Sequence, residues 1–125
     1  MNKKEKLTYL IKRISKNRNV EAIILFGSQI NGRARKDSDI DLAIITKKIS
    51  RDKELDIIGL GDDTFNISIF HRLPLIIQFR VLKEGKIILL KNPLSLHKER
   101  TKVLRNYLDF APFINKFYQR KLNGI

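Results

Sequence analysis

Two short apolar runs rich in β-branched residues constrain the fold of this chain more than any other feature. Residues 20–26 (VEAIILF) are almost entirely apolar, as expected of a strand buried inside a sheet. Residues 38–45 (SDIDLAII) begin with strict alternation, which sends Asp39 and Asp41 to one face of a strand and the apolar residues between them to the other. We therefore expect a sheet built on these two strands.

Amphipathic segments alternate with further strand-like runs along the rest of the chain. Apolar periodicity predicts helices over 3–17, 50–60, 72–84 and most of 94–122. Period-two alternation and β-branched content predict strands over 64–70 and 86–90. The class that these elements predict is α/β or α+β, with a small mixed sheet flanked by helices.

Particular residues carry the expected helix boundaries and faces. We expect Leu55, Ile58 and Leu60 to form the inner stripe of the second helix. Gly85 is a C-terminal stop for the third helix. Pro112 should break or kink the last helix, because proline removes a backbone donor and clashes with the preceding turn.

Length and composition limit the kind of protein. With 125 residues, we expect one domain over 1–125, with a core over about 1–90 and a helical extension over about 94–122. The absence of cysteine excludes disulfides and thiolate metal sites. No apolar run is long enough to cross a bilayer, and no apolar segment of a secretory signal follows the basic N-terminus. We expect a cytoplasmic protein with no membrane partner.

The charge of the chain is strongly positive and unevenly distributed. Lys and Arg number 26 against 13 acids, for a formal charge of +13, which predicts attraction to nucleotides, RNA, anionic lipid or an acidic protein. Residues 1–18 hold seven basic side chains and one acid, whereas residues 19–90 hold eleven and ten. Acids clustered within so basic a chain indicate either surface pairing or a cation site.

The segment from Leu25 to Ile45 combines two features of a phosphate-handling site. The first strand ends at Gly27 and Ser28, where glycine permits close backbone approach and backbone N–H groups of a turn can hold an anion. Ten residues later, Asp39 and Asp41 place two carboxylates side by side, and these repel unless a cation or proton lies between them. Hard oxygen ligands favour Mg²⁺, so the pattern points to phosphoryl or nucleotidyl transfer.

These residues resemble the signature of the minimal nucleotidyltransferases (MNT type) of the DNA polymerase β superfamily. The signature is Gly-Ser, ten residues and Asp-x-Asp, met here by Gly27, Ser28, Asp39 and Asp41. The resemblance extends over nearly the whole chain, through further matching positions: Gly32, Ala34, Ser38, 79–85 and 107–110.

The resemblance implies a polymerase β-like nucleotidyltransferase fold with C-terminal helices, and a role for each matching residue. Gly27 and Ser28 would contact the triphosphate, and Asp39 and Asp41 would bind two Mg²⁺ ions. Ser38 and Arg33 join the expected nucleotide-binding residues. Arg35 is an alternative to Arg33 for the phosphates, because relatives often carry Arg where this chain has Gln29 and Asn31.

The chain departs from the family at the third carboxylate, which the register of 64–68 places at Asn66. We therefore predict Asp39, Asp41 and Asn66 as the catalytic set. An asparagine carbonyl can ligate a metal, but it brings no negative charge and cannot accept a proton. Asp37, Asp62 and Asp63 are the acids near enough in sequence to substitute. The departure predicts a nucleotide binder whose transfer step is slow or absent.

The resemblance implies a partner and leaves two functions open. Relatives often pair with a small all-helical HEPN protein in toxin–antitoxin modules, and some transfer AMP to a tyrosine of that partner. The chain is then either an Mg²⁺-dependent enzyme that moves AMP from ATP onto a hydroxyl, or a weakened nucleotide-binding antitoxin that masks its partner. RNA binding is a third hypothesis, motivated by charge alone and lacking a recognisable RNA-binding motif. The sequence leaves the oligomeric state open.

The C-terminal segment carries an aromatic face. Five aromatic residues recur there at helical spacing: Tyr107, Phe110, Phe113, Phe117 and Tyr118. We expect a helical packing face, part of which a small sheet leaves uncovered for an interface.

Overall fold

The computed structural model describes residues 2–27 and 40–122 of the chain. Its elements follow in this order: α1 (Lys3–Ser15), β1 (Val20–Phe26), β2 (Ile40–Thr46), α2 (Arg51–Ile58), β3 (Phe65–Ile69), the 3₁₀ helix η1 (Phe70–Arg72), α3 (Leu75–Glu84), β4 (Lys86–Leu90) and α4 (Pro93–Leu122). The predicted strands at 20–26 and 86–90 are confirmed at both ends. Among the described helices, none is long and apolar enough to span a bilayer.

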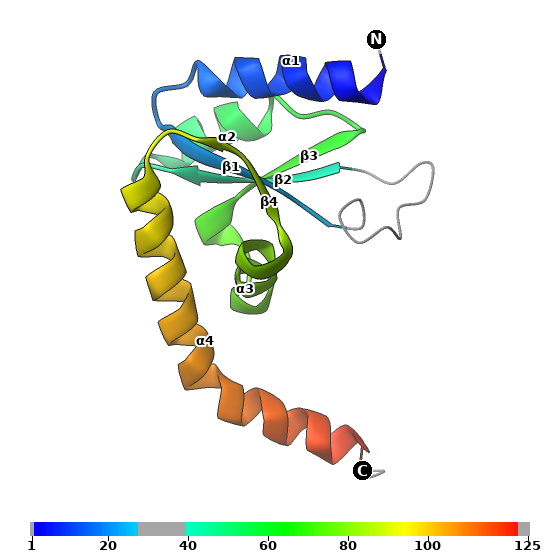
Figure 1. Ribbon diagram of the computed structural model, residues 1–125, viewed down its shortest axis with the longest axis vertical. Coiled ribbons are helices and arrows are strands. Elements are labelled where there is room, and N and C mark those ends of the chain that lie inside the picture. The colour runs from blue at the N-terminus through cyan, green and yellow to red at the C-terminus, as the bar shows by residue number, and fades with distance from the viewer. Residues whose placement is uncertain (1, 28–39, 123–125) are drawn as a thin grey trace.

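The four strands form one mixed sheet in the order β3-β2-β1-β4 (Figure 1). β1 runs antiparallel to both β2 and β4, whereas β2 runs parallel to β3. Parallel pairing requires a crossover, and α2 lies on the connection that supplies it. The predicted class, a small mixed sheet flanked by helices, is confirmed.

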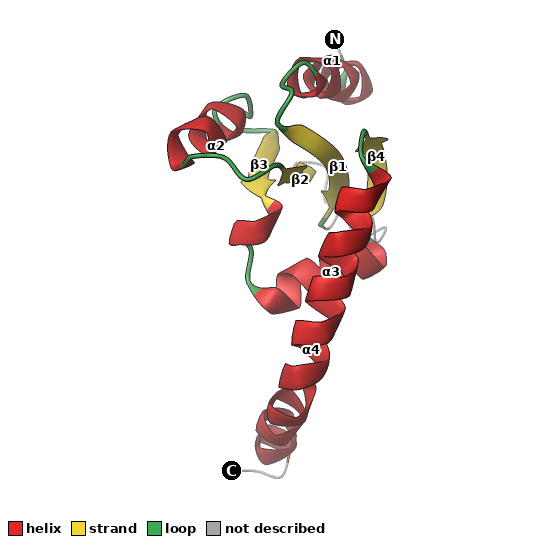
Figure 2. Cartoon of the chain, turned by 90° about the vertical axis from the view of Figure 1, so that its left-hand side faces the viewer, coloured by secondary structure: helices red, strands yellow, loops and turns green. Residues whose placement is uncertain are grey.

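Helices cover the sheet on both faces (Figure 2). On one face, Leu10 and Ile14 of α1 and Ile57 of α2 pack with the apolar side chains of β2 and β3. On the other face, Val81 of α3 and Leu96 of α4 pack in a second cluster, together with alternate residues of β1 and β2. The two central strands are therefore buried on both sides, which explains why their sequences are nearly continuous apolar runs.

Side-chain caps fix the start of the helices on the first face. The Asn2 side chain accepts a hydrogen bond from the Glu5 backbone N–H at 2.8 Å, and Ser50 accepts one from Lys53 at 3.3 Å. Each cap pairs an N–H group that the helix itself leaves without a partner. Both helices consequently begin at or near the predicted positions.

The predicted inner stripe of the second helix is partly wrong. Ile58 and Leu60 pack against the core, but Leu55 is 48% exposed. Ile57 and Glu54 occupy the buried face instead. The observed helix ends at Ile58, short of the predicted residue 60, and an apolar pattern cannot identify a buried acid such as Glu54 as an inward-facing position.

Proline shapes both the third helix, which starts later than predicted, and the fourth. α3 starts at Leu75 rather than residue 72, because Pro74 is its N-cap and the preceding residues form η1. α4 does not break at Pro112, which lies inside one continuous helix. Figure 1 shows that α4 changes direction in its C-terminal half, which agrees with the kink that was predicted as the alternative to a break, because proline removes a helical hydrogen bond.

Gly85 joins α3 to β4 at a point where backbone and core come very close. A Cβ there would lie 2.3 Å from the Val81 carbonyl oxygen and 2.6 Å from a methyl carbon of Ile24. The glycine thus ends α3 while letting the helix terminus rest directly on β1. The predicted stop at this residue is confirmed.

A buried carboxylate ties α2 to η1 around the edge strand β3. Glu54 is 1% exposed and bonds Arg51 at 3.0 Å, His71 at 2.6 Å and Arg72 at 3.1 Å. Burial raises the pKa of Glu54, but the hydrogen bonds from these three side chains and the charge of Arg72 outweigh it and lower the pKa to about 2. Of these contacts, only the Arg51–Glu54 pair, three residues apart in one helix, is recognisable from the sequence.

We predict that Glu54→Gln lowers the free energy of unfolding at pH 7 by roughly 2–3 kcal/mol, because charge-assisted hydrogen bonds in a buried site are lost. A folded-state pKa near 2, below the ordinary 4.5, stabilises the protein above about pH 4.5 and loses this effect as the pH falls toward 2. Urea unfolding of both proteins across this range should show their difference shrinking.

Asp56→Asn, an exposed substitution on the same helix, is the matched control and should leave stability nearly unchanged at every pH. A Glu54→Gln protein as stable as the parent at pH 7 would contradict the assigned role of Glu54.

Candidate functional site

The candidate site lies where β1 ends and β2 begins. Phe26 pairs with Asp41 across the two strands, and Gly27 follows directly with a φ of 100°. A Cβ at this glycine would lie 2.5 Å from Oδ2 of Asp41. The backbone at residue 27 therefore passes against the Asp41 carboxylate with no room for a side chain, in a conformation that favours glycine.

Asn66 lies beside Asp41 on the neighbouring strand. The parallel register of β2 and β3 aligns the two residues, and Nδ2 of Asn66 donates to Oδ1 of Asp41 at 3.5 Å, the outer limit of a hydrogen bond. Asp41 lies two residues from Ala43 on β2 and shares its face, whereas Asn66 is adjacent to Phe65, which points to the opposite face, so Asp41 and Asn66 both point to the face of the sheet that α3 and α4 cover. The structure thus brings together three predicted site residues: Gly27, Asp41 and Asn66.

The other predicted site residues lie outside the described residues. They are Ser28, Arg33, Ser38 and Asp39, together with the alternatives Arg35 and Asp37. Their roles stay predictions from sequence.

Asp62, one of the acids considered as a substitute for the third carboxylate, bonds the backbone at the start of β3. It accepts hydrogen bonds from the backbone N–H groups of Thr64 at 2.8 Å and Phe65 at 3.0 Å. These bonds, that of Phe65 foremost, hold the pKa of the Asp62 carboxyl below its usual range. Asp62 therefore shapes the turn that leads into β3.

The donors at this site suit a hard cation. Among the described residues, no group of three or more His, Cys, Asp or Glu side chains gathers to hold a metal ion. What this part of the chain offers is one carboxylate, Asp41, and one amide, Asn66, both oxygen donors of the kind that Mg²⁺ accepts. A magnesium site here needs further ligands, which the prediction assigns to Asp39 and substrate phosphates.

The amide at position 66 changes the electrostatics of the pair. An asparagine can donate an N–H toward Asp41, whereas an aspartate at the same distance would repel it. Across β2 and β3, the amide therefore avoids the like-charge repulsion that an aspartate at position 66 would create.

A family comparison identifies the class of protein that this fold and site define. The model described as "Polymerase beta, Nucleotidyltransferase" matches residues 9–94, which include all four strands and the candidate site. The chain belongs to the polymerase β nucleotidyltransferase family.

Particular relatives extend this comparison. The chain is 35% identical over 69 residues to the candidate protein adenylyltransferase MJ1547 of Methanocaldococcus jannaschii, and the match spans 55% of each chain. A toxin–antitoxin structure with AMP-PNP matches 94% of this chain and 99% of its own, with a TM-score of 0.66 and 16% identity.

A second structural relative is a chain from a complex of tri-AMPylated Shewanella oneidensis HEPN toxin with MNT antitoxin. It matches 91% of this chain and 94% of its own, with a TM-score of 0.59 and 16% identity. At this identity both structural matches establish the shared fold, which includes α4 as well as the sheet.

We predict that Gly27→Ala destabilises the protein by about 1–3 kcal/mol, because alanine is strained at this φ and its Cβ would displace the Asp41 carboxylate. Thermal unfolding checks this. The matched control is Gly59→Ala, at a helical φ of −64°, which should cost far less. Equal effects of the two substitutions would contradict the proposed crowding at residue 27.

We predict that Asn66→Asp makes stability dependent on Mg²⁺. Two carboxylates about 3.5 Å apart repel, so the melting temperature should fall in EDTA and recover in millimolar Mg²⁺. Asn66→Ala removes the amide without adding charge and is the matched control. If Mg²⁺ raises the melting temperature of both variants equally, Asp41 and residue 66 do not form a cation site.

Proposed function

We propose that this chain binds ATP as its magnesium chelate and transfers AMP to a hydroxyl of a HEPN-type partner protein, and that it thereby acts as an antitoxin. The observation that supports the proposal is the contact between the Gly27 backbone and the Asp41 carboxylate, within a chain of the nucleotidyltransferase family. A glycine turn that holds phosphates beside a carboxylate that holds a cation is the arrangement that nucleotidyl transfer requires.

The proposed reaction is a displacement at the α-phosphorus of ATP. The acceptor hydroxyl oxygen forms a bond to that phosphorus, the bond to the bridging oxygen of the β-phosphate breaks, and pyrophosphate leaves while the hydroxyl loses its proton. Bound Mg²⁺ supplies positive charge that offsets the charge of the triphosphate. Gly27 lets the backbone approach the phosphates, and Asp41, with Asp39 as predicted from sequence, orients the chelate.

We expect Asn66 to lower the rate of this reaction. An amide does not take the proton of the acceptor hydroxyl, so the proton goes to water or to an acid outside the described residues. Loss of one such contribution lowers a rate by about 10²–10⁴. This residue also supports the second candidate function, a nucleotide-binding antitoxin that inhibits its partner by binding alone.

The nature of the relatives supports the choice of nucleotide and acceptor. MJ1547 carries the name of a protein adenylyltransferase, and the AMP-bearing HEPN toxin of Shewanella oneidensis was solved with its MNT antitoxin. ATP is therefore the proposed nucleotide and a protein hydroxyl the proposed acceptor.

We predict that the purified chain, incubated with α-labelled ATP, Mg²⁺ and a HEPN-type partner protein, transfers label to that protein. Asp41→Asn and Asp39→Ala should each reduce transfer by about 10²-fold or more, because both remove charge that binds the chelate. Asp56→Asn, on α2 and away from the site, should transfer at the parental rate.

Two further results decide between the candidate functions. Faster transfer by Asn66→Asp than by the parent supports a third metal-binding position at this residue. Tight binding of partner and ATP without any label transfer, by the parent or by Asn66→Asp, overturns the enzyme in favour of the binding antitoxin.

A further inference from the structure

The surface where α3 meets α4 has an apolar notch outside the candidate site. The rings of Phe79 on α3 and Tyr107 on α4 stack with centroids 3.9 Å apart and planes 7° from parallel, which holds the two helices together. Beside this stack lies a notch of about 190 Å³, lined by Phe79, Leu82, Lys83, Arg100, Val103 and Leu104. Its floor is apolar, and its two cations lie on opposite helices.

An exposed apolar ridge borders the notch on α4. Leu104 and Leu108 are one helical turn apart and are 50% and 61% exposed. They lie on the flank of α4, next to the side that packs through Val103 on the sheet. Exposed leucines at i and i+4 beside an apolar notch form a continuous patch of a kind that marks interaction surfaces.

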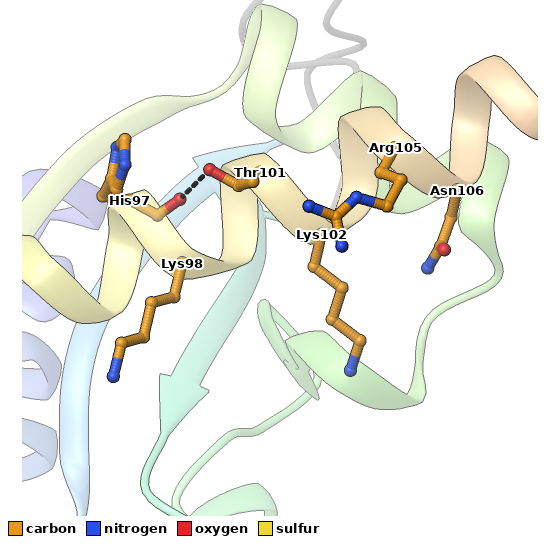
Figure 3. A pocket seen from close by; sticks show the side chains of 6 residues that line it. All are labelled: His97, Lys98, Thr101, Lys102, Arg105 and Asn106. Carbon is orange, nitrogen blue, oxygen red and sulfur yellow. Dashed lines mark hydrogen bonds between the residues drawn. The ribbon is translucent and has the colours of Figure 1, made fainter.

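A basic groove runs along the other side of this ridge. It has a volume of about 380 Å³ and is lined by His97, Lys98, Thr101, Lys102, Arg105 and Asn106. Figure 3 shows Lys98 and Lys102 extending in the same direction from α4, with Arg105 on the next turn. Over its full sequence α4 carries seven Lys and Arg against two acids, Glu99 and Asp109. The leucine ridge thus has cations on both sides, Lys83 and Arg100 on one and this groove on the other.

We propose that the notch, the leucine ridge and the basic groove form one docking surface for an acidic amphipathic helix of a partner protein. The inference rests on the proposed function, in which that partner is the HEPN-type protein. An apolar centre with a charged rim is the usual anatomy of a protein interface. An apolar side chain of the partner would enter the notch while its flanking carboxylates meet Lys83, Arg100 and the groove.

Charge and apolar area select this occupant over two others. A second copy of the chain would place the same cations against one another in a two-fold contact, which costs free energy. Nucleic acid would satisfy the cations through its phosphates but would leave Leu104 and Leu108 without an apolar counterpart. An acidic amphipathic helix complements both features together.

The test measures binding of the purified HEPN-type protein by calorimetry, using the full chain. Leu104→Asp/Leu108→Asp should weaken binding about 30-fold or more, because central apolar contacts carry most interface energy. Lys98→Glu/Lys102→Glu/Arg105→Glu should also weaken binding and flatten its salt dependence. The matched control, Leu55→Asp, changes an equally exposed leucine on α2 and should bind within about twofold of the parent.

The same variants show whether the protein still folds and whether docking and AMP transfer can be separated. Each variant should keep the parental melting temperature and Mg-ATP affinity, and Leu108→Asp alone serves where the double variant unfolds. Parental binding by the folded leucine variants overturns the docking surface but leaves the proposed transfer intact. Loss of label transfer together with intact docking overturns the enzyme instead.

Three results would assign this surface to another role or to none. Variants that bind a single-stranded RNA oligonucleotide more weakly but the partner normally would make it an RNA-binding face. Variants that only dissociate a dimer in sedimentation would make it a self-association face. Absence of any partner binding by the parent chain would overturn both the docking surface and the antitoxin role.

Discussion

Burial of both faces of β1 and β2 is the constraint on which the candidate site depends. Side chains alternate along a strand, so a shift of one residue in the pairing of β2 would send Leu42 to the site and Asp41 into the core beneath α1 and α2. The apolar residues on either side of Asp41 exclude that arrangement. The core thereby fixes the position of the acid relative to Gly27 and Asn66, although it contributes no atom to the site.

Different interactions hold the candidate site in place on its β1 side and on its β3 side. Toward β1, contact is steric, because Gly27 and Gly85 let backbone lie against neighbouring atoms without a side chain between them. Toward β3, contact is electrostatic, because Glu54 fastens η1, which directly follows the strand that carries Asn66. Within a chain of formal charge +13, the buried Glu54 carboxylate lies among the side chains of Arg51, His71 and Arg72, and its negative charge reduces the repulsion between the two arginines.

Short-range sequence patterns predicted most of the helices and strands. Some features that depend on contacts between residues distant in sequence were not predicted. Alternation and β-branched content predicted β1 and β4 at both ends, and the register of 64–68 placed Asn66 on the strand where it pairs with Asp41. The inward position of Glu54 was not predictable, since its partners on η1 are seventeen and eighteen residues away. Likewise, Pro112 predicted either a break or a kink, and its local sequence did not decide between them.

The order of strands in the sheet has a consequence for synthesis on the ribosome. β1 is a central strand, yet its neighbour β4 begins at Lys86, sixty residues after β1 ends at Phe26. A growing chain therefore holds an apolar strand with one open edge until β4 has been translated. Such edges pair readily with other chains, so the nascent protein depends on rapid completion or on chaperones to reach its final fold.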